Sequence, residues 1–105
     1  MSAPVCRLES WTEGEVGTLR LVGELDLYTS SDLREGLRAL VGQGATLVVV
    51  DLADVTFADS TAMAVLVAAV KLLRAVGGEL VLKDPQPAVT KVLKLTGLDT
   101  IFTIV

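Results

Sequence analysis

The chain has 105 residues, of which 51% are hydrophobic and 21% charged, so residues 1–105 can form one compact domain with a single core. The net charge of −4, the scattered basic residues and the 4% aromatic content argue against direct nucleic-acid binding, which needs a basic stripe and stacking rings. The absence of histidine removes the commonest general base and metal ligand, and a single cysteine, Cys6, excludes an intrachain disulfide and a cysteine-rich metal site. We expect a protein without cofactors.

Residues 7–12 and 18–25 alternate loosely between apolar and polar side chains around a glycine-containing segment, which predicts a β-hairpin. Residues 29–32 then fit the capping-box pattern that opens many helices. Leucines follow at helical spacing, so we predict an amphipathic helix over about 30–41.

Residues 46–52 contain consecutive valines rather than an alternating pattern, which predicts a strand buried on both faces. A second helix is predicted over about 60–76, ending at Gly77-Gly78, and residues 79–83 form another short strand. This alternation of strands and helices predicts an α/β fold, with a mixed central β-sheet of four to five strands and helices packed on it.

The C-terminal part predicts a third helix that starts near Pro87 and is capped by Gly97. Residues 101–105 suit either a last strand or a terminal helical turn.

The hydropathy of the chain does not predict a membrane span, although its mean is +0.61. The longest uninterrupted apolar run covers residues 62–70, whereas a spanning helix needs about 20 apolar residues. The N-terminus shows no charged segment followed by an apolar one, so no secretory signal is predicted. We therefore expect a cytoplasmic protein with no membrane insertion.

The most informative segment is Asp59-Ser60-Thr61, the predicted first turn of the second helix. Asp59 suits the N-cap, because its carboxylate can accept the free N–H groups of that turn and complements the positive helix end. At about 100° per residue, a helical wheel places these side chains on one stripe with Ser60: Met63, Ala64, Val67, Lys71 and Arg74.

The two basic residues mark this stripe as the solvated side of the helix, so Met63 and Val67 are expected near the surface. Apolar side chains exposed beside polar ones favour a partner-docking surface. The alternative is that Met63 and Val67 pack under a neighbouring loop and that the hydroxyls only cap the helix. The opposite, buried side is predicted to hold Ala62, Val65, Leu66, Ala69, Leu72, Leu73 and Val76.

Five motifs are collinear along the chain. They are Gly23-Glu24-Leu25-Asp26, the strand at 47–52, Phe57-Ala58-Asp59-Ser60-Thr61, Gly77-Gly78-Glu79-Leu80 and Leu95-Thr96-Gly97-Leu98. Together they resemble the STAS domain of bacterial anti-sigma factor antagonists, and the resemblance covers nearly the whole chain. It implies a single STAS domain over residues 1–105 that is not an enzyme.

The resemblance also implies a partner-switching cycle. In that family the unphosphorylated antagonist binds an anti-sigma factor, itself a serine kinase, and so frees the sigma factor. Phosphorylation ends this binding until a serine phosphatase resets the antagonist. The first serine after the motif acid carries the phosphate, and it matches Ser60 here.

Other positions carry over one by one. Asp59 matches the motif acid, and Asp26 matches the loop acid that lies beside the phosphosite and contacts the kinase. Thr61 stands where a second serine is common in the family, so its hydroxyl is the less favoured phosphate acceptor. Ala62 stands where the family often has glycine. The predicted partner surface consists of Asp26, Asp59, Ser60, Thr61, Met63, Ala64 and Val67.

Two other hypotheses about the function remain open at this point. Asp51 ends the run of valines in a way that resembles phosphoryl-accepting aspartates, and with Asp54 it could bind Mg²⁺, although no phosphate-binding loop accompanies them. Alternatively, stand-alone STAS proteins serve as regulatory subunits of lipid-transport ABC complexes or of stress-sensing assemblies, with the same fold.

Overall fold

The computed structural model describes residues 7–105, so Cys6 and the segment examined for a secretory signal lie outside the described residues. The elements, in chain order, are β1 Arg7–Glu13, β2 Val16–Leu25, α1 Ser30–Gly42, β3 Leu47–Ala58, α2 Ser60–Ala75, β4 Glu79–Lys83, α3 Pro87–Leu95, the 3₁₀ helix η1 Leu98–Thr100 and β5 Thr103–Ile104. The predicted α/β fold with a mixed sheet is confirmed. Within residues 101–105, Thr103–Ile104 form the short strand β5, whereas Ile101 and Phe102 continue the turn that begins at η1.

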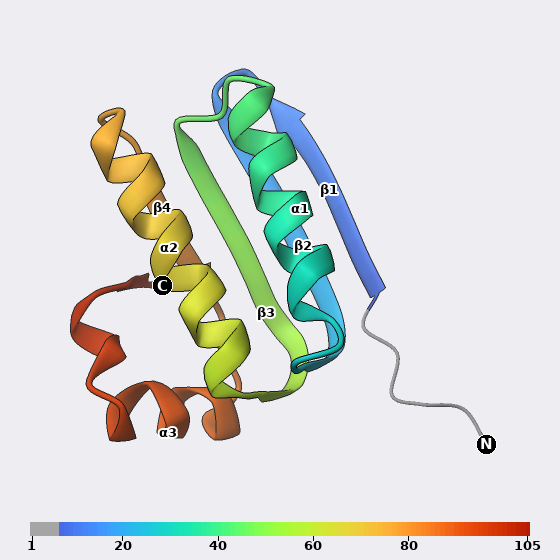
Figure 1. Ribbon diagram of the computed structural model, residues 1–105, viewed down its shortest axis with the longest axis vertical. Coiled ribbons are helices and arrows are strands. Elements are labelled where there is room, and N and C mark those ends of the chain that lie inside the picture. The colour runs from blue at the N-terminus through green and yellow to red at the C-terminus, as the bar shows by residue number, and fades with distance from the viewer. Residues whose placement is uncertain (1–6) are drawn as a thin grey trace.

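The sheet has the order β1-β2-β3-β4-β5. β1 and β2 form the predicted antiparallel hairpin, and the other neighbouring strands pair in parallel. Figure 1 shows α1 and α2 side by side across one face of this sheet, with α3 at the end of the molecule where α2 begins. The core lies between these two helices and the sheet.

The predicted burial of the 46–52 strand on both faces is wrong. In β3 the side chains of Val48 and Val50 are completely buried, whereas those of Leu47 and Val49 are only partly buried. The physical reason is that α1 and α2 cover one face of the sheet, so alternate side chains meet different surroundings.

β3 also runs further than predicted, to Ala58, because it continues to pair with β2 beyond a register shift. Asp51 therefore lies inside a strand and does not end one. The longer strand carries the chain directly into Asp59 and α2.

The helix α1 begins where predicted, but the capping box does not form. Thr29 occupies the N-cap without a side-chain bond to the helix. Its hydroxyl instead accepts a hydrogen bond from the Asp26 N–H at 2.9 Å and donates to the Glu24 carbonyl at 3.2 Å. The Thr29 side chain therefore forms hydrogen bonds within the loop before α1 and does not cap the helix as the pattern predicted.

The buried side of α2 agrees with the wheel except at its C-terminal end. Leu66 and Leu73 are completely or almost completely buried, but Leu72 is 47% exposed and Val76 is 62% exposed. Leu72 lines the open groove between α1 and α2, and Val76 follows the last residue of the helix, so neither is covered. Met63, expected near the surface, is only 2% exposed.

The turn after α2 depends on two glycines. Gly77 has φ +77°, and the Gly78 N–H donates to the Leu73 carbonyl at 2.8 Å. A Cβ atom on Gly78 would collide with the carbonyl oxygen of Thr46, because β4 starts against the beginning of β3 at this point.

Gly78→Ala is expected to lower the free energy of unfolding by about 1–3 kcal/mol, since backbone must move to admit the methyl group. Urea denaturation of the purified variant measures this loss. Gly42→Ala is the matched control: nothing lies within 4 Å of a Cβ there, and its stability should be equal or slightly higher. Equal stabilities for the two variants would contradict the close contact at Gly78.

Candidate functional site

The site is built around the start of α2. Asp59 has an extended backbone, and its carboxylate accepts a hydrogen bond from the Ala62 N–H at 3.0 Å, so it is the N-cap that the sequence predicted. The next residue, Ser60, is exposed, whereas Thr61 is partly buried. Within residues 7–105 neither hydroxyl takes part in a hydrogen bond, so the Ser60 hydroxyl faces solvent with no competing partner.

The loop between β2 and α1 lies beside this turn. The Asp59 N–H donates to the Leu25 carbonyl at 3.0 Å, and Leu25 pairs with Ala58 across the two strands. The sheet register therefore brings Asp26 and Asp59 to the same edge, as the resemblance implied, although they are far apart in sequence.

The Asp26 carboxylate is occupied within its own loop. It accepts hydrogen bonds from the N–H groups of Tyr28 at 2.9 Å and Thr29 at 3.1 Å. These bonds fix the backbone of the loop. Asp26 thus orients the loop residues that follow it.

Exposed apolar side chains on the same edge were missed by the sequence interpretation. Leu27 is 64% exposed and Tyr28 is 86% exposed in the β2–α1 loop, and Phe57 is 48% exposed near the end of β3. Their signal in the sequence was weak, because a large apolar residue in a loop or strand is normally assigned to the core. Here the loop turns Leu27 and Tyr28 outward, while Phe57 is exposed on β3.

The stripe predicted on α2 lines a shallow hollow of about 360 Å³. Its walls are Ser60, Met63, Ala64, Val67, Ala68, Lys71, Thr96 and Leu98. Met63 is buried in the core and Val67 is partly buried, so the expectation that both lie near the surface is wrong for Met63. Thr96 and Leu98, from the segment after α3, were not anticipated as part of this surface.

Arg74 does not share this hollow, although the wheel placed it on the stripe. Its guanidinium donates to the Ile101 carbonyl at 2.8 Å and to the Glu79 carboxylate at 3.4 Å. Arg74 therefore ties the end of α2 to the C-terminal segment, while Lys71 remains beside the hollow.

The possible Mg²⁺ pair finds no support in the geometry. The Asp54 carboxylate forms an ion pair with Arg20 at 2.7 Å, and Asp54 raises the pKa of the Arg20 guanidinium by this hydrogen bond and by its charge. The Asp51 carboxylate accepts a bond from the Ala53 N–H at 3.0 Å. In the range 7–105 no three metal-ligating side chains cluster.

Comparison with known proteins agrees with this fold. Residues 8–105 match the model of the STAS domain family. The chain belongs to the STAS domain family. One STAS relative, the anti-sigma-B factor antagonist of Bacillus subtilis (strain 168), is 36% identical over 86 residues, which cover 82% of this chain and 78% of the relative.

Solved STAS structures show the same architecture. An anti-sigma factor antagonist from Mycobacterium paratuberculosis aligns with a TM-score of 0.86 at 28% identity, covering 99% of this chain and 89% of that one. The anti-sigma factor antagonist SpoIIAA aligns in its unphosphorylated form with a TM-score of 0.80 at 26% identity, covering 96% of this chain and 88% of that one. Its phosphorylated form from Bacillus aligns with a TM-score of 0.73 at 26% identity, covering 96% and 91%.

These STAS relatives are regulatory binding proteins by name. None of the helices between residues 7 and 105 is long and apolar enough to cross a bilayer.

Proposed function

We propose that this STAS protein is an anti-sigma factor antagonist switched by phosphorylation of Ser60. In the unphosphorylated form it binds an anti-sigma serine kinase and releases a sigma factor in the cytoplasm. The kinase then phosphorylates Ser60, and the phosphorylated protein no longer binds it. A serine phosphatase removes the phosphate and restores the binding form. The observation that carries the proposal is the exposed, unbonded Ser60 hydroxyl, set at the N-terminus of α2 and on the wall of the hollow.

Ser60 is the better acceptor of the two hydroxyls. Phosphoryl transfer requires the attacking oxygen to reach a kinase active site, and Ser60 is exposed whereas Thr61 is partly buried. Ser60 also shares the hollow with Lys71, while Thr61 does not line it. Modification of Ser60 therefore changes the surface that a partner would meet.

The fold can accept the phosphate without rearranging. The N–H groups of Ser60 and Thr61 bond to no acceptor within the described chain, and they lie at the positive end of α2. A phosphate adds a charge of about −1.5 to −2 next to the Asp59 carboxylate. The switch is then a local change of charge and bulk on the docking surface.

The docking surface extends beyond the stripe on α2. Tyr28 and Leu27 project from the loop that Asp26 holds, and Phe57 lies on the neighbouring strand. Aromatic side chains such as those of Tyr28 and Phe57 are common anchors of protein interfaces, because their rings bury a large apolar area. We propose that they bind the kinase together with the hollow beside Ser60.

The proposal is tested by mapping the phosphate with mass spectrometry after incubation with the cognate kinase and ATP. Wild type and Thr61→Ala are expected to gain one phosphate each, and Ser60→Ala none. The kinase is obtained by pull-down from native lysate with the unphosphorylated protein as bait. Phosphate on Thr61 alone would contradict the site, and recovery of a transporter ATPase instead of a kinase would contradict the function.

The role of Asp26 can be separated from a direct charge contact. Asp26→Ala is expected to weaken kinase binding about tenfold, because the loop that carries Tyr28 loses two hydrogen bonds. Asp26→Asn keeps an oxygen acceptor and should stay within about threefold of wild type. Binding measured by calorimetry decides between the two roles: equal losses in both variants would show that the charge itself contacts the kinase.

A further inference from the structure

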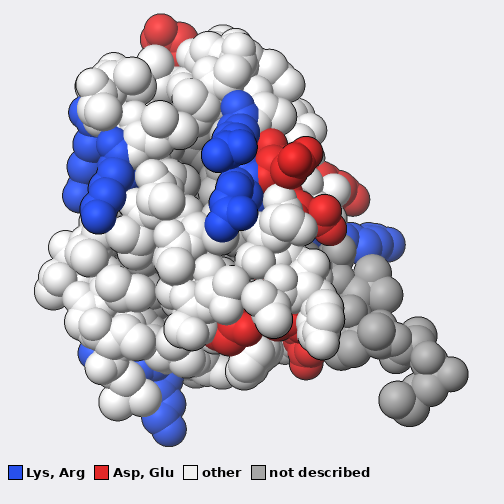
Figure 2. Space-filling model, viewed as in Figure 1, with Lys and Arg blue, Asp and Glu red and all other residues white. Residues whose placement is uncertain are grey.

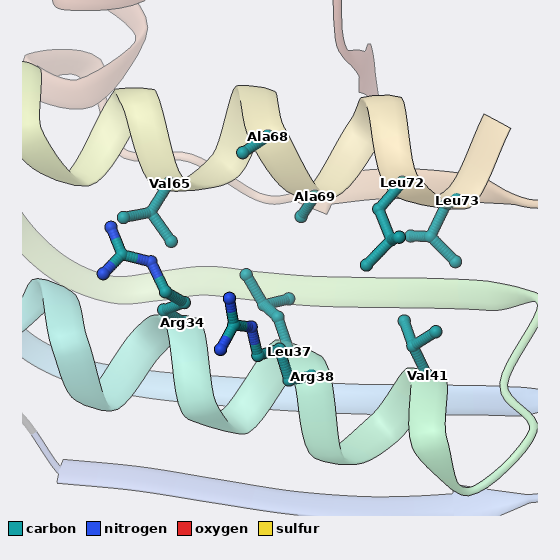
Figure 3. A pocket seen from close by; sticks show the side chains of 9 residues that line it. All are labelled: Arg34, Leu37, Arg38, Val41, Val65, Ala68, Ala69, Leu72 and Leu73. Atoms are coloured by element: carbon teal, nitrogen blue, oxygen red, sulfur yellow. The ribbon is translucent and has the colours of Figure 1, made fainter. Parts of the chain in front are cut away.

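A second surface feature lies away from Ser60, in the groove between α1 and α2. Figure 3 shows its two walls, with Arg34, Leu37, Arg38 and Val41 on α1 facing the side chains of α2. The groove encloses about 220 Å³. Its space arises at the middle of α2, where Ala68 and Ala69 are too small to meet the larger side chains of α1.

The floor of the groove is apolar. Leu37 and Val65 are each 4% exposed, and Leu73 is completely buried. The length is set by the helices: from Arg34 to Val41, or from Val65 to Leu72, the axis advances about 10 Å at 1.5 Å per residue. The groove is therefore short and has a hydrocarbon floor.

The charge is confined to one end. Figure 3 places both guanidinium groups toward the end marked by Val65, while Val41 and Leu72 stand at the opposite end without a charged neighbour in the lining. Figure 2 shows several basic side chains on the face of the molecule that carries α1 and α2, with acidic side chains beside some of them. The groove has a cationic end and an apolar end.

The two arginines have no anionic partner of their own. The ion pairs found within residues 7–105 join Arg20 to Asp54 and Arg74 to Glu79. Arg34 and Arg38 lie one helical turn apart, so their donors can converge on a single anion. Asp32 and Glu35 on the same helix are exposed and do not line the groove, so the lining itself carries two positive charges and no negative one.

We propose that the α1–α2 groove binds an unbranched medium-chain carboxylate. The carboxylate lies between Arg34 and Arg38, and the alkyl chain runs over Leu37 toward Val41 and Leu72. The enclosed volume is smaller than the roughly 300–1,000 Å³ of pockets for drug-sized ligands, which argues against a nucleotide. A thin chain with one charged end matches the size, the length and the uneven charge of the groove.

The test is a titration of the ¹⁵N-labelled protein with sodium decanoate below its micelle concentration, followed by amide chemical shifts. Saturable shifts are expected along residues 34–41 and 65–73. Decyltrimethylammonium, which carries the same chain with the opposite charge, should produce none. Shifts centred on the hollow beside Ser60, or equal binding of the cation, would overturn the proposal.

Variants test the charged end of the site. The double change Arg34→Gln with Arg38→Gln is expected to weaken decanoate binding at least tenfold. Both positions are exposed, so the fold should persist, and the dispersion of the amide spectrum checks this. Lys91→Gln with Lys94→Gln is the matched control on α3 and should bind as wild type does. Undiminished binding by the double arginine variant would overturn the proposal.

Discussion

Replacing Ser60 by aspartate is expected to weaken binding to the anti-sigma kinase by more than about tenfold, whereas Ser60→Ala should bind like wild type. The aspartate adds a hydrated charge beside the Asp59 carboxylate and at the rim of the hollow. Loss of one central interface contact commonly costs about 2 kcal/mol or more, which exceeds tenfold in affinity. Isothermal titration calorimetry with the purified kinase measures both variants.

The effect of charge alone is controlled by Gln43→Glu. Gln43 is exposed at the opposite end of α1, so this variant adds the same net charge at a distance from the site. Its affinity should equal that of wild type. If Ser60→Asp also bound with wild-type affinity, exclusion of the kinase by charge and bulk at the first turn of α2 would be refuted.

Leu66→Ala is expected to lower the free energy of unfolding by about 2–5 kcal/mol, through loss of buried surface and the cavity left behind. Leu66 is 1% exposed in the layer between α2 and the sheet. Because small domains are stable by only about 5–15 kcal/mol, this single change removes a large share of the stability. Chemical denaturation followed by circular dichroism gives the value.

Leu72→Ala is the matched control on the same helix. It makes the same chemical change at a side chain that is 47% exposed, so the loss should stay within about 1 kcal/mol. A loss as large as that of Leu66→Ala would mean that Leu72 is covered by structure not seen in residues 7–105.

These two leucines mark the limit of prediction from the sequence. A helical wheel placed Leu66 and Leu72 on the buried side of α2, because it takes account only of the angle of each side chain around the helix axis. Burial also depends on how closely the neighbouring helix packs against each side chain, and Leu72 lies on the wall of the open groove between α1 and α2. The same limit applies to Met63, which the wheel placed on the solvated side and which is buried, at the hollow that Thr96 and Leu98 also line.

Asp59 was predictable, because helix capping is a local interaction between a carboxylate and N–H groups one turn away. Thr29 fitted the capping-box pattern as well, but its hydroxyl forms hydrogen bonds with Asp26 and Glu24 in the preceding loop instead. Local patterns predict an interaction only where no other group competes for the same atom.

The sequence by itself determined the order of strands and helices, the N-cap at Asp59 and the position of Ser60 on the first turn of α2, because periodicity and capping act over a few residues. Tertiary structure alone decided that β3 extends to Ala58, that the end of β2 lies beside the start of α2, and that Tyr28 and Phe57 face solvent. Those features depend on strand register and on which face the helices cover, and both arise from contacts between distant parts of the chain.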